Sequence, residues 1–266
     1  MRERELDSGK SLNFPVIEAN KAAPMPKTSS GTADFRSEYL IELFSRMAKT
    51  YGAVNLISSF GFSHLWRKAC VDALEVEPGH CCADLMAGMA ESSVIMARRT
   101  RGALTIHAVD FCPTMSAKAH EVAQHLKLPG IQVQTADVLG LPGDEVYDRI
   151  CATFGLKTLD ENKQMLFATV LHRLLKPGGR FSLVEIYVPS GAILKWPFLF
   201  YLRYVIPLVG RFFLDDPDCY RSLAIYAEDF AQRNQMGEHL ARAGFKVESR
   251  LLFFGCAKLF VGERSM

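Results

Sequence analysis

The sequence predicts an α/β fold, a doubly wound and mostly parallel sheet of seven strands within a single domain. Two observations lead to this expectation. From residue 80 onward, short apolar runs alternate with amphipathic stretches of helical length, which is the pattern of βαβ units with helices on both faces of a sheet. Near the C-terminus, two apolar runs lie too close together for a helical crossover, so we expect them to pair as an antiparallel hairpin.

The N-terminal part is expected to lie outside the sheet. Residues 1–36 mix both charges with three prolines and a run of small polar residues, which indicates a flexible tail. A helical entry segment follows over 37–51 and 63–76, where apolar residues recur at helical spacing. The second of these helices is expected to bury Leu65, Trp66 and Leu74 on one side. A single domain is expected over 37–266.

The seven strands and their helices follow in chain order. Strands are predicted over 81–86, 104–109, 131–135, 147–153, 180–188, 245–254 and 256–261. Helices are predicted over 90–100, 113–126, 160–175 and 228–243.

One strongly apolar segment, 192–214, does not fit this alternation and is interpreted as part of an insertion over about 190–225. It contains many aromatic residues, with Lys195, Arg203 and Arg211 eight residues apart. Two prolines and these three cations interrupt any stretch long enough to span a bilayer. Two interpretations stay open: a helical excursion packed on the sheet edge, or a lid over an apolar ligand that touches a membrane surface.

Composition and charge exclude other classes of protein. The 266 residues are 49% hydrophobic and 23% charged, as in globular proteins. A net charge of only +2 argues against a nucleic-acid partner. Seven cysteines without C-x-x-C spacing, and no apolar signal at the start, favour a reduced, cytoplasmic compartment. No metal-ligand spacing is found, and the oligomeric state, a homodimer included, is left open.

Small and acidic residues at successive strand ends predict a nucleotide-type site. Ligands of doubly wound sheets bind beyond the carboxyl ends of the strands. The first strand contains Asp84 and runs into the turn at Gly88, Asp110 ends the second strand, and Asp137 follows the third. Asp110 is placed to accept hydrogen bonds from two ribose hydroxyls. Asp137 is placed to accept a hydrogen bond from the exocyclic amine of adenine.

The same turn discriminates between nucleotides. It has one glycine rather than G-x-G-x-x-G, and Glu91 stands where the next helix begins. An acid there repels a pyrophosphate but tolerates S-adenosylmethionine, which carries a positive sulfonium and no phosphate. S-adenosylmethionine is therefore the expected cofactor.

Several blocks of the chain resemble the UbiE/MenG-type quinone C-methyltransferases, which have the class I methyltransferase fold. The likeness runs over roughly 40–262 and is most specific in S-S-F-G-F-S-H-L-W-R at 58–67 and F-G-L at 154–156. Further matching blocks are 43–55, 175–180, 206–210 and 218–223, together with Glu185.

The resemblance implies methyl transfer from S-adenosylmethionine to a ring carbon of a polyprenylated quinol, an apolar aromatic acceptor. Carried over by position, the family's cofactor contacts fall on Met89, Asp110, Asp137, Val138 and Thr153. The chain departs from the family pattern at three places. Gly88-Met-Ala-Glu91 replaces Gly-Thr-Gly-Asp, Gly52 replaces an aspartate, and Lys157-Thr158 replaces Arg-Asn.

Methylation of a quinol carbon requires a base or a cation near the phenol, because the phenolate makes the ring carbon nucleophilic. His64 is the first candidate for the base and Lys157 for the cation. Tyr51 and Tyr220 are candidates for hydrogen bonds to the acceptor or cofactor, and Glu185 faces the same end of the sheet. Each also has an ordinary structural interpretation. Two alternatives remain: a methyltransferase acting on a specialised aromatic metabolite, and a non-catalytic relative of the fold that binds a partner or lipid.

Overall fold

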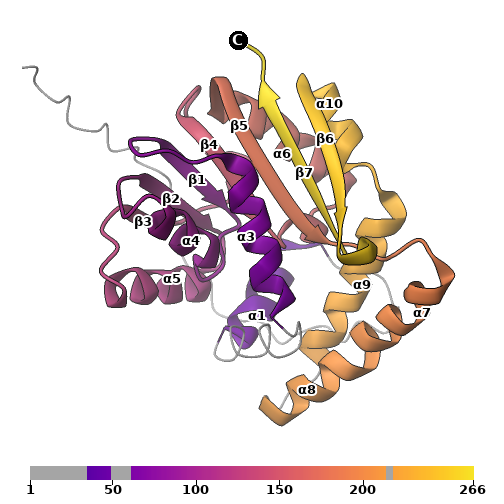
Figure 1. Cartoon of the computed structure of the whole chain (residues 1–266). Coiled ribbons are helices and arrows are strands. Elements are labelled where there is room, and N and C mark those ends of the chain that lie inside the picture. Colours follow the sequence, from indigo (N-terminus) through magenta and orange to yellow (C-terminus); the bar gives the residue numbers. More distant parts are fainter. Residues whose placement is uncertain (1–34, 49–60, 214–217) are drawn as a thin grey trace, which may run out of the picture.

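The computed structural model describes residues 35–48, 61–213 and 218–266 and contains the predicted sheet (Figure 1). Its strands are β1 (Cys81–Leu85), β2 (Thr105–Asp110), β3 (Ile131–Thr135), β4 (Tyr147–Thr153), β5 (Leu175–Ile186), β6 (Phe245–Leu252) and β7 (Ala257–Arg264). Their order is β3-β2-β1-β4-β5-β7-β6, parallel except for β7, which is antiparallel to both β5 and β6. The mostly parallel, doubly wound fold with its C-terminal hairpin is therefore confirmed.

Helices cover both faces of the sheet because the central strands β1, β4 and β5 are buried on both sides. The helices near the sheet are α3 (Phe62–Leu74), α4 (Glu91–Arg99), α5 (Pro113–His125), α6 (Glu161–Leu174) and α10 (Met236–Arg242). One core cluster contains Phe167 and Leu171 of α6 with Leu240 of α10. The other, on the opposite face, contains Leu74 of α3 and Met96 of α4. Figure 1 shows α3, α4 and α5 on the near side and α6 behind the sheet.

A third, smaller cluster lies at the edge where the parallel strands end. It joins α1 (Ser37–Met47) to the π-helical turn η3 (Tyr201–Val205) and to α9 (Asp218–Arg233). Leu43, Leu202 and Tyr226 are buried there. The chain reaches this edge through α7 (Ala192–Phe200) and leaves η3 through α8 (Ile206–Phe213). The apolar insertion is thus a run of helices set against the ends of the strands.

Two details differ from the sequence prediction. The predicted helix over 228–243 is two helices, because Asn234 takes a left-handed conformation (φ 46°) and its Oδ1 accepts a hydrogen bond from Lys258 Nζ at 2.7 Å. The buried face of α3 is also rotated from the expected one. It contains Arg67 and Val71, whereas Leu65 is exposed.

Some predicted features lie outside the described residues. These are almost all of the N-terminal tail, the segment after Ala48 that holds Tyr51, and the link between α8 and α9. Among the helices that the structure does describe, none is both long and apolar enough to cross a membrane.

Candidate active site

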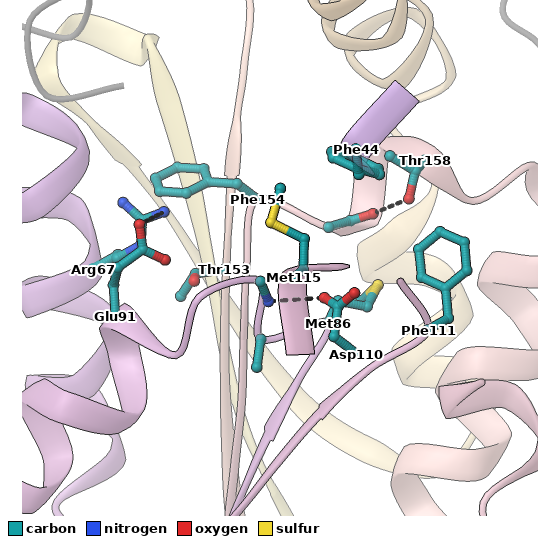
Figure 2. A pocket seen from close by; sticks show the side chains of 13 residues that line it. Phe44, Arg67, Met86, Glu91, Asp110, Phe111, Met115, Thr153, Phe154 and Thr158 are labelled. Atoms are coloured by element: carbon teal, nitrogen blue, oxygen red, sulfur yellow. Dashed lines mark hydrogen bonds and ion pairs between the residues drawn. The ribbon is translucent and has the colours of Figure 1, made fainter. Parts of the chain in front are cut away.

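A cavity opens at the carboxyl ends of β1, β2 and β4 (Figure 2). This is the topological switch point of the sheet, because β2 and β3 lie on one side of β1, and β4 and β5 lie on the other. This is the position at which doubly wound sheets bind ligands. The empty space within the cavity is about 470 Å³, part of which is open to solvent. Gly88, Asp110 and Thr153 line it, so three of the predicted cofactor residues meet there.

The turn after β1 is held in shape by a buried carboxylate. Asp84 is fully buried, and its Oδ2 accepts hydrogen bonds from Ser93 N–H at 2.9 Å and Ser93 Oγ at 2.7 Å. Burial raises the pKa of Asp84 to about 7. Asp84 does not line the cavity; it ties the first turn of α4 to β1. Gly88 (φ 57°) and Ala90 (φ 63°) are left-handed here, a conformation that carries strain for alanine.

Asp110 is the carboxylate that faces the cavity. Its Oδ2 accepts a hydrogen bond from Gly88 N–H at 2.8 Å and its Oδ1 one from Cys112 N–H at 2.9 Å. Only 6% of the residue is exposed, and this burial raises its pKa to about 6. Each oxygen of the carboxylate can accept a further hydrogen bond. Asp110 can therefore hold two neighbouring hydroxyl groups of a ligand.

One end of the cavity is apolar. Phe44 of α1 and Phe111, just after β2, meet edge to face with ring centroids 6.4 Å apart. Met115 of α5 closes the same side. Two rings and a thioether offer flat, polarizable surfaces suited to a planar aromatic group.

The other end of the cavity carries charge. Arg67 Nη2 lies 3.4 Å from Glu91 Oε1, and the guanidinium carbon lies 4.8 Å from the ring centroid of Phe154. Thr153 Oγ1 and Ser92 Oγ are hydrogen-bonded at 3.0 Å beside them. Sequence reasoning gave Arg67 no role, although it stands in the 58–67 block. The sequence signal that could have found Arg67 is a cation on the apolar face of α3, which Cys70, Val71 and Leu74 continue.

Lys157 does not reach the cavity as a free cation. Its side chain is 2% exposed, and its ammonium donates to Glu185 Oε1 at 3.0 Å and to the carbonyl oxygen of Phe154. The backbone N–H of Lys157 also donates to Glu185 Oε2 at 3.0 Å. Phe154 is left-handed (φ 64°), so this buried ion pair fixes a strained residue whose ring forms a cavity wall. Lys157 and Glu185 are thus placed to hold Phe154 in position.

The cavity lining does not include Met89, Asp137, Val138 or His64. Asp137 is exposed, and its Oδ1 accepts a hydrogen bond from Leu139 N–H at 2.9 Å, where it caps a short 3-10 helix. Val138 is buried below it, and Met89 packs near Cys112 and Met115. His64 is exposed in the first turn of α3. Tyr220 belongs to α9, and Tyr51 is outside the described residues. Their proposed contacts stay predictions.

The strand order, the glycine turn after β1 and the buried acid that ends β2 together define a class I S-adenosylmethionine-dependent methyltransferase. A solved O-methyltransferase family protein from Burkholderia thailandensis has the same fold, with a TM-score of 0.61 at 17% identity over 89% of this chain and 65% of that one. The model of the ubiE/COQ5 methyltransferase family matches residues 32–263, so this chain belongs to that family.

Curated relatives agree with the family. A demethylmenaquinone methyltransferase from Thermus thermophilus is 32% identical over 84% of this chain and 100% of its own length. A ubiquinone/menaquinone biosynthesis C-methyltransferase UbiE from Geotalea daltonii is 28% identical over 86% of this chain and 97% of its own. The chain is an S-adenosylmethionine-dependent methyltransferase.

The residues present fit that cofactor. The apolar end suits an adenine ring, and Asp110 suits the two hydroxyls of a ribose. Glu91 lines the cavity as an acid at the start of α4, where a dinucleotide phosphate would be repelled and a sulfonium compound is accepted. The sequence argument for S-adenosylmethionine over NAD therefore has a structural counterpart.

Proposed function

We propose that this enzyme methylates a ring carbon of a prenylated quinol. The observation that carries the proposal is the full-length likeness to a protein named demethylmenaquinone methyltransferase. The cavity supports it, because Phe154 and Met86 give the site apolar walls against which a quinol ring can lie. A carbon acceptor needs such a wall to hold its ring flat beside the donor.

S-adenosylmethionine, when bound, supplies an electrophilic methyl group. The chain must orient the acceptor carbon, keep water out and help remove a phenolic proton, whose pKa is about 10 in a free phenol. Lys157 and Glu185 contribute by fixing Phe154 in its wall position. His64 is our candidate for the proton acceptor. It stands three residues before Arg67 on α3, which puts the two side chains on neighbouring positions of one helix surface.

A different aromatic acceptor is the alternative. The family's Arg-Asn pair is Lys157-Thr158 in this chain, and neither side chain matches the fork of an arginine. Thr158 lines the cavity, and its Oγ1 donates to the carbonyl of Gly155 at 2.7 Å. At this wall the acceptor meets a hydroxyl and a methyl group in place of an amide, which suits an acceptor with another ring substituent.

We also propose that the acceptor is taken from a membrane surface by the outer face of α7 and η3. Ile193, Trp196, Phe200 and Tyr204 recur at helical spacing on that face and are 89%, 69%, 60% and 62% exposed. The inner face of the same helices is apolar as well, because Leu199 and Leu202 are buried and Leu202 belongs to the small cluster at the strand ends.

Lipid is the partner that this outer face fits best. Lys195 is exposed among the apolar residues, and a cation beside tryptophan and tyrosine suits anionic headgroups. Phe253 and Phe254 are also exposed, in the short turn after β6. This turn follows a strand parallel to β5, so it lies at the same end of the sheet as the cavity.

The acceptor can be tested with methyl-labelled S-adenosylmethionine. Purified enzyme is incubated with reduced, prenylated demethyl-naphthoquinol and, separately, with a prenylated benzoquinol and a simple phenol. Mass spectrometry with fragmentation then locates the label. We expect label on a ring carbon of one prenylated quinol, and less label with Asp110→Asn enzyme under the same conditions. Label on oxygen, or on the simple phenol alone, would contradict the proposal.

A further inference from the structure

A row of aromatic side chains runs from the wall of the cavity to the surface of the protein. Its inner end is Phe154, which lines the cavity and is buried. The ring centroids of Phe154 and Trp66 are 6.3 Å apart, and those of Trp66 and Phe62 are 6.0 Å apart. Phe253 follows at 3.9 Å from Phe62, and Phe254 at 5.5 Å from Phe253. These last two side chains are 46% and 78% exposed, so the row ends in solvent.

Two segments that are far apart in the sequence build this aromatic row. Phe62, Leu65 and Trp66 stand at positions i, i+3 and i+4 of α3, which places them on one side of the helix. Leu65 is exposed and extends this apolar strip beside the row. The two outer rings belong to the turn η4 (Phe253–Gly255), which joins β6 to β7. Because β6 runs parallel to β5, this turn lies at the edge of the sheet where the cavity opens.

The backbone of the turn is strained where it carries the outer rings. Phe253 (φ 44°) and Phe254 (φ 53°) are both left-handed, a conformation that costs free energy for a bulky side chain. Glycine or asparagine takes this conformation at lower cost. Strained residues of this kind are concentrated at sites that bind ligands. The geometry of the turn therefore does not require two exposed phenylalanines, and their presence indicates a ligand.

We propose that the aromatic row binds the isoprenoid tail of the acceptor while the quinol ring lies in the cavity. The proposal rests on the proposed function, which gives the enzyme a prenylated acceptor. The row begins at Phe154, a wall against which the quinol ring is placed, so the tail of the same molecule can continue along it. A single file of rings without a charged member suits an uncharged, flexible hydrocarbon chain.

The inner part of the row distinguishes a tail from broader partners. Trp66 and Phe62 are only partly exposed, and Phe154 is 7% exposed. A bilayer or a second copy of this chain can contact the two outer rings, but its flat surface does not follow the row down to the cavity wall. A narrow chain can contact every member of the row.

Acceptors that share one ring and differ only in tail length test the row. The prenylated naphthoquinol and benzoquinol of the labelling assay are prepared without a tail and with one, two or three isoprene units. The assay contains no vesicles, so membrane binding does not contribute. We expect the wild-type kcat/KM to rise by about tenfold for each of the first two units, because each unit buries apolar carbon.

Two variants each remove one ring from the row. In Phe254→Gly and in Phe62→Ala, the ratio of kcat/KM between the two-unit and the tail-less acceptor should fall by about fivefold. Phe254→Gly should also melt at or above the wild-type temperature, because glycine relieves the left-handed strain. Weaker tail recognition in an equally stable protein is not explained by misfolding. Leu166→Ser, at an exposed apolar position of α6, is the matched control and should keep the wild-type ratio.

Farnesol, a prenyl alcohol without a ring, separates binding at the row from the reaction. The sequence has two tryptophans, so Trp66 alone reports in Trp196→Phe enzyme. Farnesol should shift the emission of this partly exposed indole to shorter wavelength in a saturable way. The double variant Trp196→Phe/Phe254→Gly should bind farnesol about fivefold more weakly.

The outcomes distinguish this proposal from the proposed function. If the enzyme methylates a quinol with a kcat/KM that does not depend on tail length, the row is not a tail subsite. If Phe254→Gly keeps the tail-length ratio but reduces vesicle flotation, or turns a dimer into a monomer in sedimentation, the row contacts a bilayer or a second copy instead. If no quinol is methylated, the proposed function fails. Saturable farnesol binding at Trp66 would then still support the row, and its absence would overturn it.

Discussion

Asp110→Asn should weaken S-adenosylhomocysteine binding by about 10- to 100-fold. The carboxylate accepts Gly88 N–H at 2.8 Å and Cys112 N–H at 2.9 Å, one on each oxygen. An asparagine has one oxygen, so its NH2 group must face one of these two N–H donors. The variant therefore loses one backbone hydrogen bond and one acceptor for a ribose hydroxyl. A hydrogen bond to a charged group contributes about 1.5–3 kcal/mol, and 1.4 kcal/mol is a factor of ten.

The same carboxylate should make wild-type binding depend on pH. Because burial raises the pKa of Asp110 to about 6, the group is mostly ionised at pH 7 and about one-tenth ionised at pH 5. If the ionised form binds the ribose, affinity is about tenfold lower at pH 5 than on the plateau above pH 7. A raised pKa also means that the folded state takes up this proton more readily than the unfolded state. Protonation of Asp110 thus favours folding at low pH, and its effect on affinity is separate from acid unfolding.

Calorimetry with S-adenosylhomocysteine from pH 5 to pH 8 measures both effects. The wild-type affinity should rise to a plateau with a midpoint near pH 6, and the Asp110→Asn affinity should be low and flat. A flat wild-type profile would refute the assignment of Asp110 to the ribose. An Asp110→Asn profile with the wild-type midpoint would assign the titration to another group, such as Asp84, whose pKa is raised to about 7.

Three further perturbations test the other parts of the site. Lys157→Met leaves the fully buried Glu185 without its cation, so the free energy of unfolding in urea should fall by about 3–5 kcal/mol, and Lys157→Met/Glu185→Gln should recover part of it; a variant as stable as the wild type would show that the pair contributes nothing. Replacing Trp196 and Phe200 by serine should reduce flotation with anionic vesicles and leave S-adenosylhomocysteine affinity unchanged, whereas equal flotation of both proteins argues against the membrane surface. His64→Ala should lower turnover on an identified quinol by about 10²–10⁴ with little change in cofactor affinity, and near-normal turnover would move the proton to another acceptor.

The sequence was informative where the fold itself brings residues together. Gly88, Asp110 and Thr153 meet because the carboxyl ends of neighbouring parallel strands share one edge of the sheet. The same rule does not tell which residues at this edge of the sheet line the cavity and which do not. Asp137 follows the outermost strand β3, and one of its oxygens is bound to the backbone of its own turn.

Contacts between distant segments were beyond the sequence patterns. Lys157 follows β4 as predicted, but its partner Glu185 stands 28 residues later on β5. The two meet because Thr153 pairs with Val184 in the sheet register. Arg67 was missed because its role depends on the packing of α3 beside β4, which placed a cation in the stripe that periodicity assigns to apolar residues.

The inner position of β7 has a consequence for how the molecule is made. β5 ends at Ile186, and the strand that covers its free edge begins only at Ala257, after α7, α8, α9 and α10 have been synthesised. β6 emerges from the ribosome before β7 but joins the sheet only through it. For all that time a nascent chain presents the apolar edge of β5 and the exposed aromatic residues of α7 to its surroundings. Completion of the sheet is therefore a late, non-local step, and we expect nascent chains of this protein to depend on chaperones until β7 has docked.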